Sequence, residues 1–249
     1  LLTGKITQEE EAEHRCLTLH WPSPPVRIIT IQLEDKGRNS TLLEMKREGQ
    51  IREMGRILDC HYLQGVVVTR KKSCFCIIDA DVPRELLLKI SQEFAEKTRE
   101  LNNSCCFVVL SDEIVDYLDI PSVYEAVTES FLIREIKQEK KECVFLSDLQ
   151  YDRILLHTAQ REETKDFVQK KLGVLEEYDR AHESFLMETI DMLAKKHGSR
   201  KLAAEALFLH RNTMAHRIHK IEEILNIDLD DMDVLQQLEF ACRLRAYMQ

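Results

Sequence analysis

Two histidines, an asparagine and several cationic side chains lie close together between residues 211 and 220 of this 249-residue chain. Imidazole groups can hold a metal ion, and imidazole, amide and guanidinium groups can all form hydrogen bonds with a nucleic acid. The metal interpretation is weak, because His216 and His219 at i, i+3 spacing have no further ligands beside them. The chain also lacks a glycine-rich phosphate loop, an H-E-x-x-H motif and a G-x-S-x-G motif. We therefore expect no catalytic residue, no metal and no cofactor.

The stretch 202–225, LAAEALFLHRNTMAHRIHKIEEIL, predicts two helices separated by a break near Leu209 and His210. At 100° per residue the second helix has one apolar stripe, made of Met214, Ile218, Ile221 and Leu225. The opposite face carries the residues that we expect to contact base edges, Asn212, Ala215, His216 and His219. The residues expected to contact phosphates flank this face or begin the preceding helix, and they are Ser199, Arg200, Lys201, Arg211, Thr213, Arg217 and Lys220. This arrangement suits a DNA major groove, although periodicity alone fits a solvated surface helix equally well.

The overall composition is that of a soluble protein with one large or two smaller domains. The formal net charge is -9, with 44% hydrophobic and 32% charged residues, so any DNA-binding surface must be local. No apolar run approaches the ~18 residues that a membrane span needs. The acidic start without Met is not a signal peptide, and we expect a cytoplasmic protein with a further segment upstream. None of the eight cysteines forms a C-x-x-C pair, which favours buried free thiols over a metal or redox site.

The first 150 residues alternate between apolar strand-like runs and amphipathic helices. The predicted strands are 26–33, 62–69, 74–79, 105–110 and 144–146, and the predicted helices are 6–19, 41–59, 83–101 and 121–140. This order predicts a mixed sheet with helices packed against it. We expect a helical junction over 151–180 and an all-α bundle over 181–249, whose first helix covers 183–196. Within the bundle, small Ala203 and Ala206 are expected to let the following helix approach closely.

The C-terminal third closely resembles the helix-turn-helix of PucR/CdaR-type bacterial transcriptional regulators. The residues that match the diagnostic run of that family are Leu207, Phe208, His210, Arg211, Asn212, Thr213, Arg217, Ile221, Glu222 and Glu223. Tyr178 and Asp179 stand where this family has a Tyr-Asp pair before its DNA-binding bundle, and we expect them to pack and to cap a helix. His216 and His219 depart from the arginine-rich pattern, so affinity gained from phosphates should be modest and greater below pH ~6.5.

The first domain resembles the GGDEF-like domain of the same regulators, an α+β fold related in topology to nucleotide cyclases. In active cyclases the hairpin after the second strand carries the catalytic glycines and carboxylates. Here the hairpin reads TRKKSCF over 69–75, with no glycine and no carboxylate before Asp79. Metal-assisted phosphoryl transfer needs such carboxylates, so we expect a catalytically silent domain that dimerises the protein or relays a signal.

The resemblance implies a transcriptional regulator that binds a double-stranded DNA operator as a homodimer or higher homo-oligomer. It also implies that the effector is sensed by a domain upstream of this chain. Two other interpretations remain open: a nucleotide-binding or cyclase-like signalling domain with a helical tail, and a helical module that binds protein but not DNA.

Overall fold

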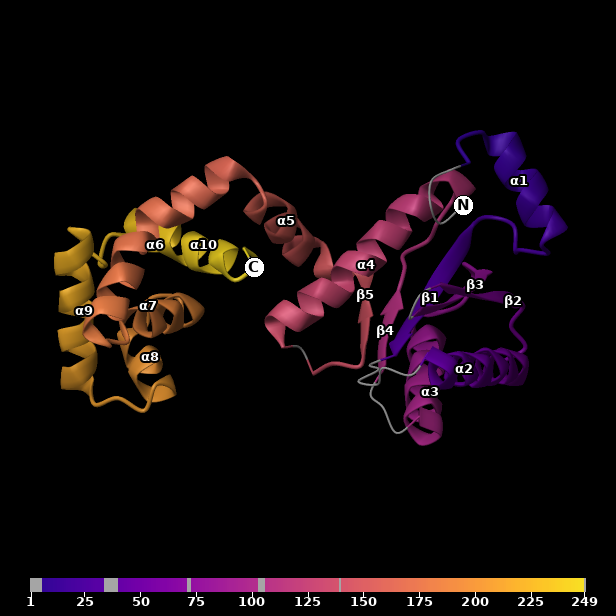
Figure 1. The fold of residues 1–249 in the computed structure, drawn as a ribbon, viewed down its shortest axis with the longest axis horizontal. Helices are drawn as coiled ribbons and strands as arrows, with labels where there is room; N and C mark the ends of the chain where they lie inside the picture. The colour runs from indigo at the N-terminus through magenta and orange to yellow at the C-terminus, as the bar shows by residue number, and fades with distance from the viewer. Residues whose placement is uncertain (1–5, 34–39, 71–72, 103–105, 139, 249) are drawn as a thin grey trace. The chain divides into compact units, whose positions relative to one another are not determined.

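The computed structural model describes residues 6–33, 40–70, 73–102, 106–138 and 140–248. It divides into two compact units, Leu1–Arg153 and Ile154–Gln249 (Figure 1). The first unit contains all the strands among the described residues, and the second is helical.

The first unit is an α+β fold. Its helices are α1 (Glu9–Thr18), α2 (Ser40–Cys60), α3 (Arg84–Asn102) and α4 (Ile120–Lys137), with short 3-10 turns η1 (Tyr117–Asp119) and η2 (Leu146–Leu149). Its strands are β1 (Val26–Leu33), β2 (Gly65–Arg70), β3 (Ser73–Asp79), β4 (Cys106–Leu110) and β5 (Cys143–Phe145). They form one sheet in the order β2-β3-β1-β4-β5. Only β4 and β5 pair in parallel, so the prediction of a mixed sheet is confirmed.

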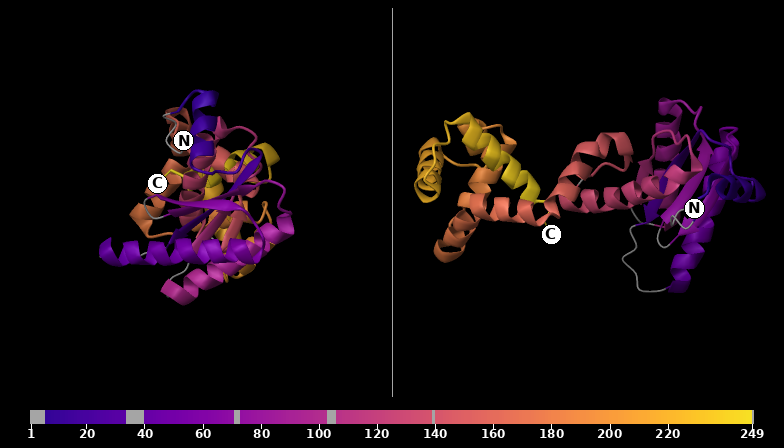
Figure 2. Two further views of the ribbon diagram at one scale, coloured as in Figure 1. Left: turned by 90° about the vertical axis from the view of Figure 1, so that its right-hand side faces the viewer. Right: turned by 90° about the horizontal axis from the view of Figure 1, so that it is seen from above.

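Helices cover both faces of this sheet (Figure 1, Figure 2). Side chains from α2 and α3, such as Met54 and Phe94, pack on the face that carries Ile29 and Ile31. Side chains from α1, η1 and α4 pack on the face that carries Ile28. Double coverage explains why β1 and β4 are apolar almost throughout and do not alternate with period two.

The predicted strand and helix order of the first unit agrees with the structure to within a few residues. Three boundaries differ by three residues: α1 begins later and α4 ends earlier than predicted, and the strand predicted at 62–69 begins only at Gly65. Tyr62 has a positive φ of 56° and is 95% exposed, so the chain turns there before it enters the sheet. A local backbone reversal of this kind leaves no trace in hydrophobic periodicity.

The cysteines follow the expectation of buried free thiols in most cases. The buried ones among the described residues are Cys16, Cys74, Cys76, Cys106 and Cys242, whereas Cys143 is half-buried and Cys60 is exposed. Burial raises the pKa of Cys76 and of Cys106 to about 12, because the thiolate is poorly solvated there. Within the described residues, no three His, Cys, Asp or Glu side chains are grouped so that they could hold a metal ion. None of the helices described is long and apolar enough to cross a membrane.

The second unit consists of six helices that follow one another through short connections. They are α5 (Gln150–Ala159), which begins in the first unit, α6 (Glu162–His182), α7 (Leu186–Lys195), α8 (Arg200–Ala206), α9 (Arg211–Leu225) and α10 (Met232–Arg245). Helix α10 packs against α6 and α7, and α9 packs against α6, α7 and α8. The core includes Leu172, Leu175, Ile190, Leu193, Ile221, Leu238 and Leu244.

One buried polar atom in the sheet has no partner. The Thr30 side chain is fully buried in the middle of β1, and its hydroxyl has no hydrogen-bond partner among the described residues. Its neighbours across the sheet, Phe75 and Val109, are apolar. An unpaired hydroxyl in such surroundings destabilises the folded state because the hydrogen bonds to water are lost and not replaced.

We predict that Thr30→Val raises the free energy of unfolding by about 1 kcal/mol, since it removes the hydroxyl and keeps the shape of the side chain. Thr30→Ser is the matched control, which keeps the hydroxyl and loses a methyl group, and should lower stability by about 1 kcal/mol. Urea denaturation followed by Trp21 fluorescence measures both, because Trp21 is the single tryptophan of the chain and packs on this face of the sheet. A Thr30→Val protein no more stable than the parent would contradict the assignment.

Candidate nucleic-acid interface

Helices α8 and α9 are joined by a four-residue turn over 207–210. Ser199 caps α8 by accepting a hydrogen bond from the backbone N–H of Leu202 at 3.3 Å. The turn contains Phe208, which has a positive φ of 56°, and the N–H of Leu209 donates to the carbonyl of Ala204 at 2.9 Å. A short helix, a tight turn and a longer helix form a helix-turn-helix.

The buried small residues of α8 are Ala203 and Ala204. Ala203, one of the two alanines expected to let the following helix approach closely, is among them, whereas Ala206 lies in the last turn of α8 and is half-buried. Helices α8 and α9 pack against each other.

Helix α9 is held by its predicted apolar stripe. Met214, Ile218 and Ile221 are at most 2% exposed, and Leu225 is partly buried. All four predicted base-edge residues are exposed on the other side, namely Asn212, Ala215, His216 and His219. The structure therefore places these four side chains together on one accessible face of the helix.

The start of α9 is capped by a residue that the sequence analysis did not select. His210 is the N-cap, and its Nδ1 accepts a hydrogen bond from the backbone N–H of Asn212 at 3.3 Å. An imidazole nitrogen accepts only when it carries no proton, so this cap requires an unprotonated Nδ1. Histidine is uncommon at N-caps, where Ser, Thr, Asp and Asn prevail, and residue type therefore gave no indication of this role.

Some predicted phosphate contacts are already engaged within the protein. Arg200 pairs with Asp230 at 2.7 Å and lies 3.6 Å from Glu222, which ties the start of α8 to the acidic loop before α10. Lys220 donates to Glu223 at 2.8 Å, and this hydrogen bond raises the pKa of Lys220 and lowers that of Glu223. Exposed pairs of this kind contribute little to stability, so DNA can compete for them.

Other predicted phosphate contacts are free of such pairing. Arg211, Thr213 and Lys201 are exposed, and the described residues include no ion pair for Lys201 or Arg211. These two cations, one at the start of α8 and one at the start of α9, are available in the described structure.

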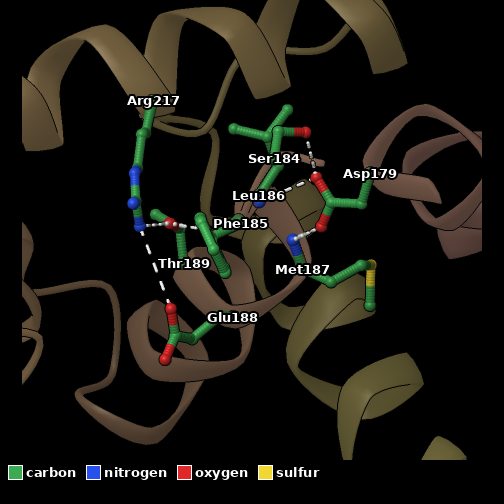
Figure 3. A network of polar contacts seen from close by, with 8 residues as sticks. All are labelled: Asp179, Ser184, Phe185, Leu186, Met187, Glu188, Thr189 and Arg217. Atoms are coloured by element: carbon green, nitrogen blue, oxygen red, sulfur yellow. Dashed lines mark hydrogen bonds and ion pairs between the residues drawn. The ribbon is translucent and has the colours of Figure 1, made fainter. Parts of the chain in front are cut away.

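Arg217 lies on the inner flank of α9, and its guanidinium reaches back to α7 (Figure 3). Its Nη1 donates to the hydroxyl of Thr189 at 3.2 Å and lies 4.0 Å from the carboxylate of Glu188. The guanidinium carbon is also 5.5 Å from the ring centroid of Phe185. The Arg217 side chain is only 20% exposed, and Thr189 is fully buried. Arg217 therefore anchors α9 to the helix beneath it.

The carboxylate of Asp179, near the end of α6, caps the next helix (Figure 3). Its Oδ1 accepts from the backbone N–H of Leu186 at 2.9 Å and from the hydroxyl of Ser184. Its Oδ2 accepts from the N–H of Met187 at 2.8 Å. Two otherwise unpaired donors at the start of α7 are thereby satisfied, and the predicted capping role of Asp179 is confirmed.

This cap also explains an error in the predicted helix boundaries. The prediction began a helix at Glu183, but Glu183 ends α6 in a left-handed conformation, with φ at 50°, and α7 begins only at Leu186. Tyr178 packs as expected, since its ring stacks on His182 at 4.0 Å and Lys220 lies 5.6 Å from it.

Phe208 is the most exposed large apolar side chain among the described residues, at 97%. Nothing in the described structure accounts for a phenyl ring at this position. Thr189 and Phe185 were not selected in the sequence analysis, because their contacts with Arg217 join separate helices.

A helix-turn-helix with a packed inner stripe and an exposed donor-rich face defines a DNA-binding domain of the kind that transcriptional regulators carry. Residues 186–244 match the family model of the PucR C-terminal helix-turn-helix domain. This match covers α7, α8, α9 and nearly all of α10, which is the part of the chain that contains the helix-turn-helix and the helices that support it.

Two curated relatives come from Bacillus subtilis (strain 168). The proline-responsive transcriptional activator PutR is 34% identical over 86 residues, which cover 34% of this chain and 21% of PutR. The purine catabolism regulatory protein is 31% identical over 91 residues, which cover 36% of this chain and 17% of that protein. The matched region thus spans about a fifth or less of either relative.

The crystal structure of a regulator of polyketide synthase expression from Bifidobacterium adolescentis aligns with 98% of this chain and 95% of that chain. The TM-score is 0.38 and the identity is 12%, a similarity too low to support any structural conclusion.

We predict that Asp179→Ala loosens the start of α7 by about 1 kcal/mol, because it removes the acceptor for two helix N–H groups. Hydrogen exchange of the peptide that contains Leu186 and Met187 should become roughly fivefold faster. Ser184→Ala is the matched control, which removes the hydroxyl that donates to Asp179 and leaves both backbone bonds, and should change the exchange rate much less. Equal acceleration in both variants would show that the backbone bonds are not what fixes α7.

Proposed function

We propose that this chain binds a double-stranded DNA operator through α9, which enters the major groove, and that it acts in the cytoplasm as a homodimer or higher homo-oligomer. The observation that carries the proposal is the exposed face of Asn212, Ala215, His216 and His219, opposite the buried stripe of α9. The match of residues 186–244 to a DNA-binding family supports it.

The four side chains of this face suit base edges in different ways. An asparagine amide can donate to and accept from adenine at N6 and N7, and an alanine methyl can contact the methyl group of thymine. Imidazoles offer a donor and an acceptor when neutral, and two donors when charged. Because Asn212 lies in the first turn of α9, it lies in the half of a recognition helix that usually approaches the bases.

Phosphate contacts are proposed mainly for Lys201, Arg211 and Thr213, which are exposed. Phosphate contacts from Ser199, Arg200 and Lys220 require that existing interactions break first. Ser199 already caps α8, and the two cations have acidic partners. A single helix-turn-helix with so few available cations binds DNA weakly. Two helix-turn-helix domains on an operator with two-fold symmetry add their contacts with DNA, and this favours a dimer.

The first domain, over 1–150, is proposed to be a GGDEF-like domain without catalytic activity, linked through a helical junction over 151–180 to the DNA-binding domain over 181–249. The sheet order β2-β3-β1-β4-β5 with helices on both faces supports an α+β domain of this type. The β2–β3 hairpin has no glycine or carboxylate between Thr69 and Phe75, which supports the absence of metal-dependent phosphoryl transfer. Dimerisation or relay of a signal is the proposed role.

A selection of bound fragments from a genomic DNA library tests the proposal directly. We expect a small set of enriched sequences with two-fold symmetry, which then serve as the cognate site in binding titrations. Asn212→Ala should weaken binding to that site by about 1–3 kcal/mol and affect random DNA far less, because only base contacts distinguish sequences.

Lys170→Ala is a suitable control, because Lys170 is an exposed cation of α6 outside the helix-turn-helix. It should leave the preference for the cognate site unchanged. Equal losses for Asn212→Ala on cognate and random DNA would refute the assignment of the reading face, and a selection without enrichment would refute sequence-specific binding.

Arg217 requires a separate test, because the sequence analysis expected a phosphate contact and the structure shows an anchor to Thr189. We propose that Arg217 positions α9. Thr189→Val should then reproduce most of the loss of DNA affinity caused by Arg217→Ala, although Thr189 is fully buried and cannot contact DNA.

The salt dependence distinguishes the two roles of Arg217. A positioning residue leaves the slope of log affinity against log salt nearly unchanged, whereas loss of one phosphate contact reduces its magnitude by about 0.9. A reduced slope for Arg217→Ala, together with normal binding by Thr189→Val, would establish the phosphate contact instead.

A further inference from the structure

The first unit contains a cavity of about 250 Å³ beside the edge strand β5. Its walls come from the second half of α4, the first turn of α3, β5, η2 and the first turn of α5. The DNA-binding face belongs to other residues, so the proposed operator binding leaves this cavity without a role.

The floor of the cavity is apolar. It is formed by buried Phe107, Ile133, Val144 and Phe145 together with half-buried Leu149. A dry floor of this kind favours a ligand with an apolar body, since burial of apolar surface is worth roughly 25 cal/mol per Å².

The rim of the cavity is predominantly cationic. Its charged residues are Arg84, Arg134, Lys137 and Lys141, against Asp148 and Asp152, so four cations face two carboxylates and leave a surplus of two positive charges. Among the described residues that line the cavity there is no other acidic side chain. In a chain of net charge -9, a local surplus of this sign is unusual and favours a negatively charged ligand.

Two of these cations are held in place by aromatic rings. The Arg84 guanidinium lies 3.6 Å from the ring centroid of Phe145, and that of Arg134 lies 4.6 Å from the ring centroid of Phe107. Stacking restricts the guanidinium planes before any ligand arrives, which reduces the entropy lost on binding.

Existing partners of the rim cations do not close the cavity. Arg84 and Asp148 are 3.5 Å apart, and both side chains are more than half exposed, so their pairing is weak and exchangeable. Arg134 and Lys141 also have partners within the protein. Selectivity for an anion therefore comes from the surplus of positive charge above the apolar floor. It does not require an unpaired side chain.

We propose that this cavity binds a small organic anion, with one carboxylate or phosphate group over the rim cations and an apolar body on the floor. Its volume lies just below the ~300–1,000 Å³ typical of sites for drug-sized ligands, so the ligand is the size of a small metabolite. The first unit is then a ligand-binding domain.

Binding at this cavity acts on a contact at the start of α5. Lys137 of α4 donates to Asp152 of α5 at 3.0 Å, and both residues line the cavity. Arg153 donates to Glu129 at 2.6 Å and joins the same two helices. An anion beside Lys137 competes with Asp152, and this weakens an ion pair that holds the first turn of α5 to α4.

The test uses calorimetric titration of the full chain with three probes of similar size: phenyl phosphate, benzoate and neutral benzyl alcohol. We expect one of the two anions to bind with 1:1 stoichiometry and a dissociation constant of about 1 mM or lower. Which anion binds shows whether the head group is phosphate or carboxylate. Benzyl alcohol should bind at least tenfold more weakly.

Lys141→Gln and Arg134→Gln should each lower the affinity for the anion by about tenfold. Lys141 is exposed, so its replacement leaves the fold intact even if that of Arg134 does not. Lys89→Gln is the matched control, because it removes an exposed cation from α3 outside the cavity and should have no effect.

Cys143 provides a readout of location, because it is half-buried and lines the cavity. In a Cys60→Ser protein, the bound anion should slow alkylation of Cys143 by iodoacetamide. The proposal would be overturned if neither anion bound, or if benzyl alcohol bound as tightly as the anions. It would also be overturned if Lys89→Gln weakened anion binding as much as the cavity variants, or if the anion did not protect Cys143 from alkylation. None of these results depends on DNA binding, so the two proposals fail independently.

Discussion

The burial of Met214, Ile218 and Ile221 against the other helices of the second unit is the contact on which the DNA-binding surface depends. Each such side chain contributes about 1.5–3 kcal/mol, whereas an exposed ion pair contributes at most about 1 kcal/mol. The apolar stripe, and not the surrounding charges, therefore sets the rotation of α9 about its own axis. A rotation by one residue, 100°, would bury part of the donor-rich face and expose an isoleucine.

Rotation alone does not fix where α9 lies along its neighbours, and the polar contacts of Figure 3 supply that constraint. Asp179 determines the residue at which α7 begins, and this places Thr189 one turn further on. The Thr189 hydroxyl donates to the Phe185 carbonyl at 2.8 Å and accepts from Arg217, so its donor and acceptor roles are both used. Removal of the Asp179 carboxylate leaves the N–H groups of Leu186 and Met187 without their acceptor, which costs more than the hydrogen bonds contribute.

Much of this arrangement could be predicted from the sequence, because it depends on patterns with a fixed period. Met214, Ile218 and Ile221 repeat at the helical spacing, and β1 over Val26–Leu33 is mostly apolar since helices cover both faces of the sheet. The start of α7 was misplaced because the carboxylate that caps it lies on α6, seven residues earlier. The inward orientation of Arg217 and the cavity beside β5 depend on side chains that meet only after folding, so no local pattern indicated them.

An acidic chain that binds DNA has to obtain its affinity from short-range contacts, because its overall field repels a polyanion. Lys201 and Arg211 are the cations of the helix-turn-helix without an ion pair in the described structure. For each helix-turn-helix, two phosphate contacts correspond to a slope of log affinity against log salt concentration of roughly -1.8. A repressor with many such contacts has a slope of about -10. Non-specific binding is correspondingly weak, while hydrogen bonds to base edges do not depend on counterion release. For the proposed operator binding, the scarcity of available cations raises the ratio of specific to non-specific affinity and favours a second helix-turn-helix in the complex.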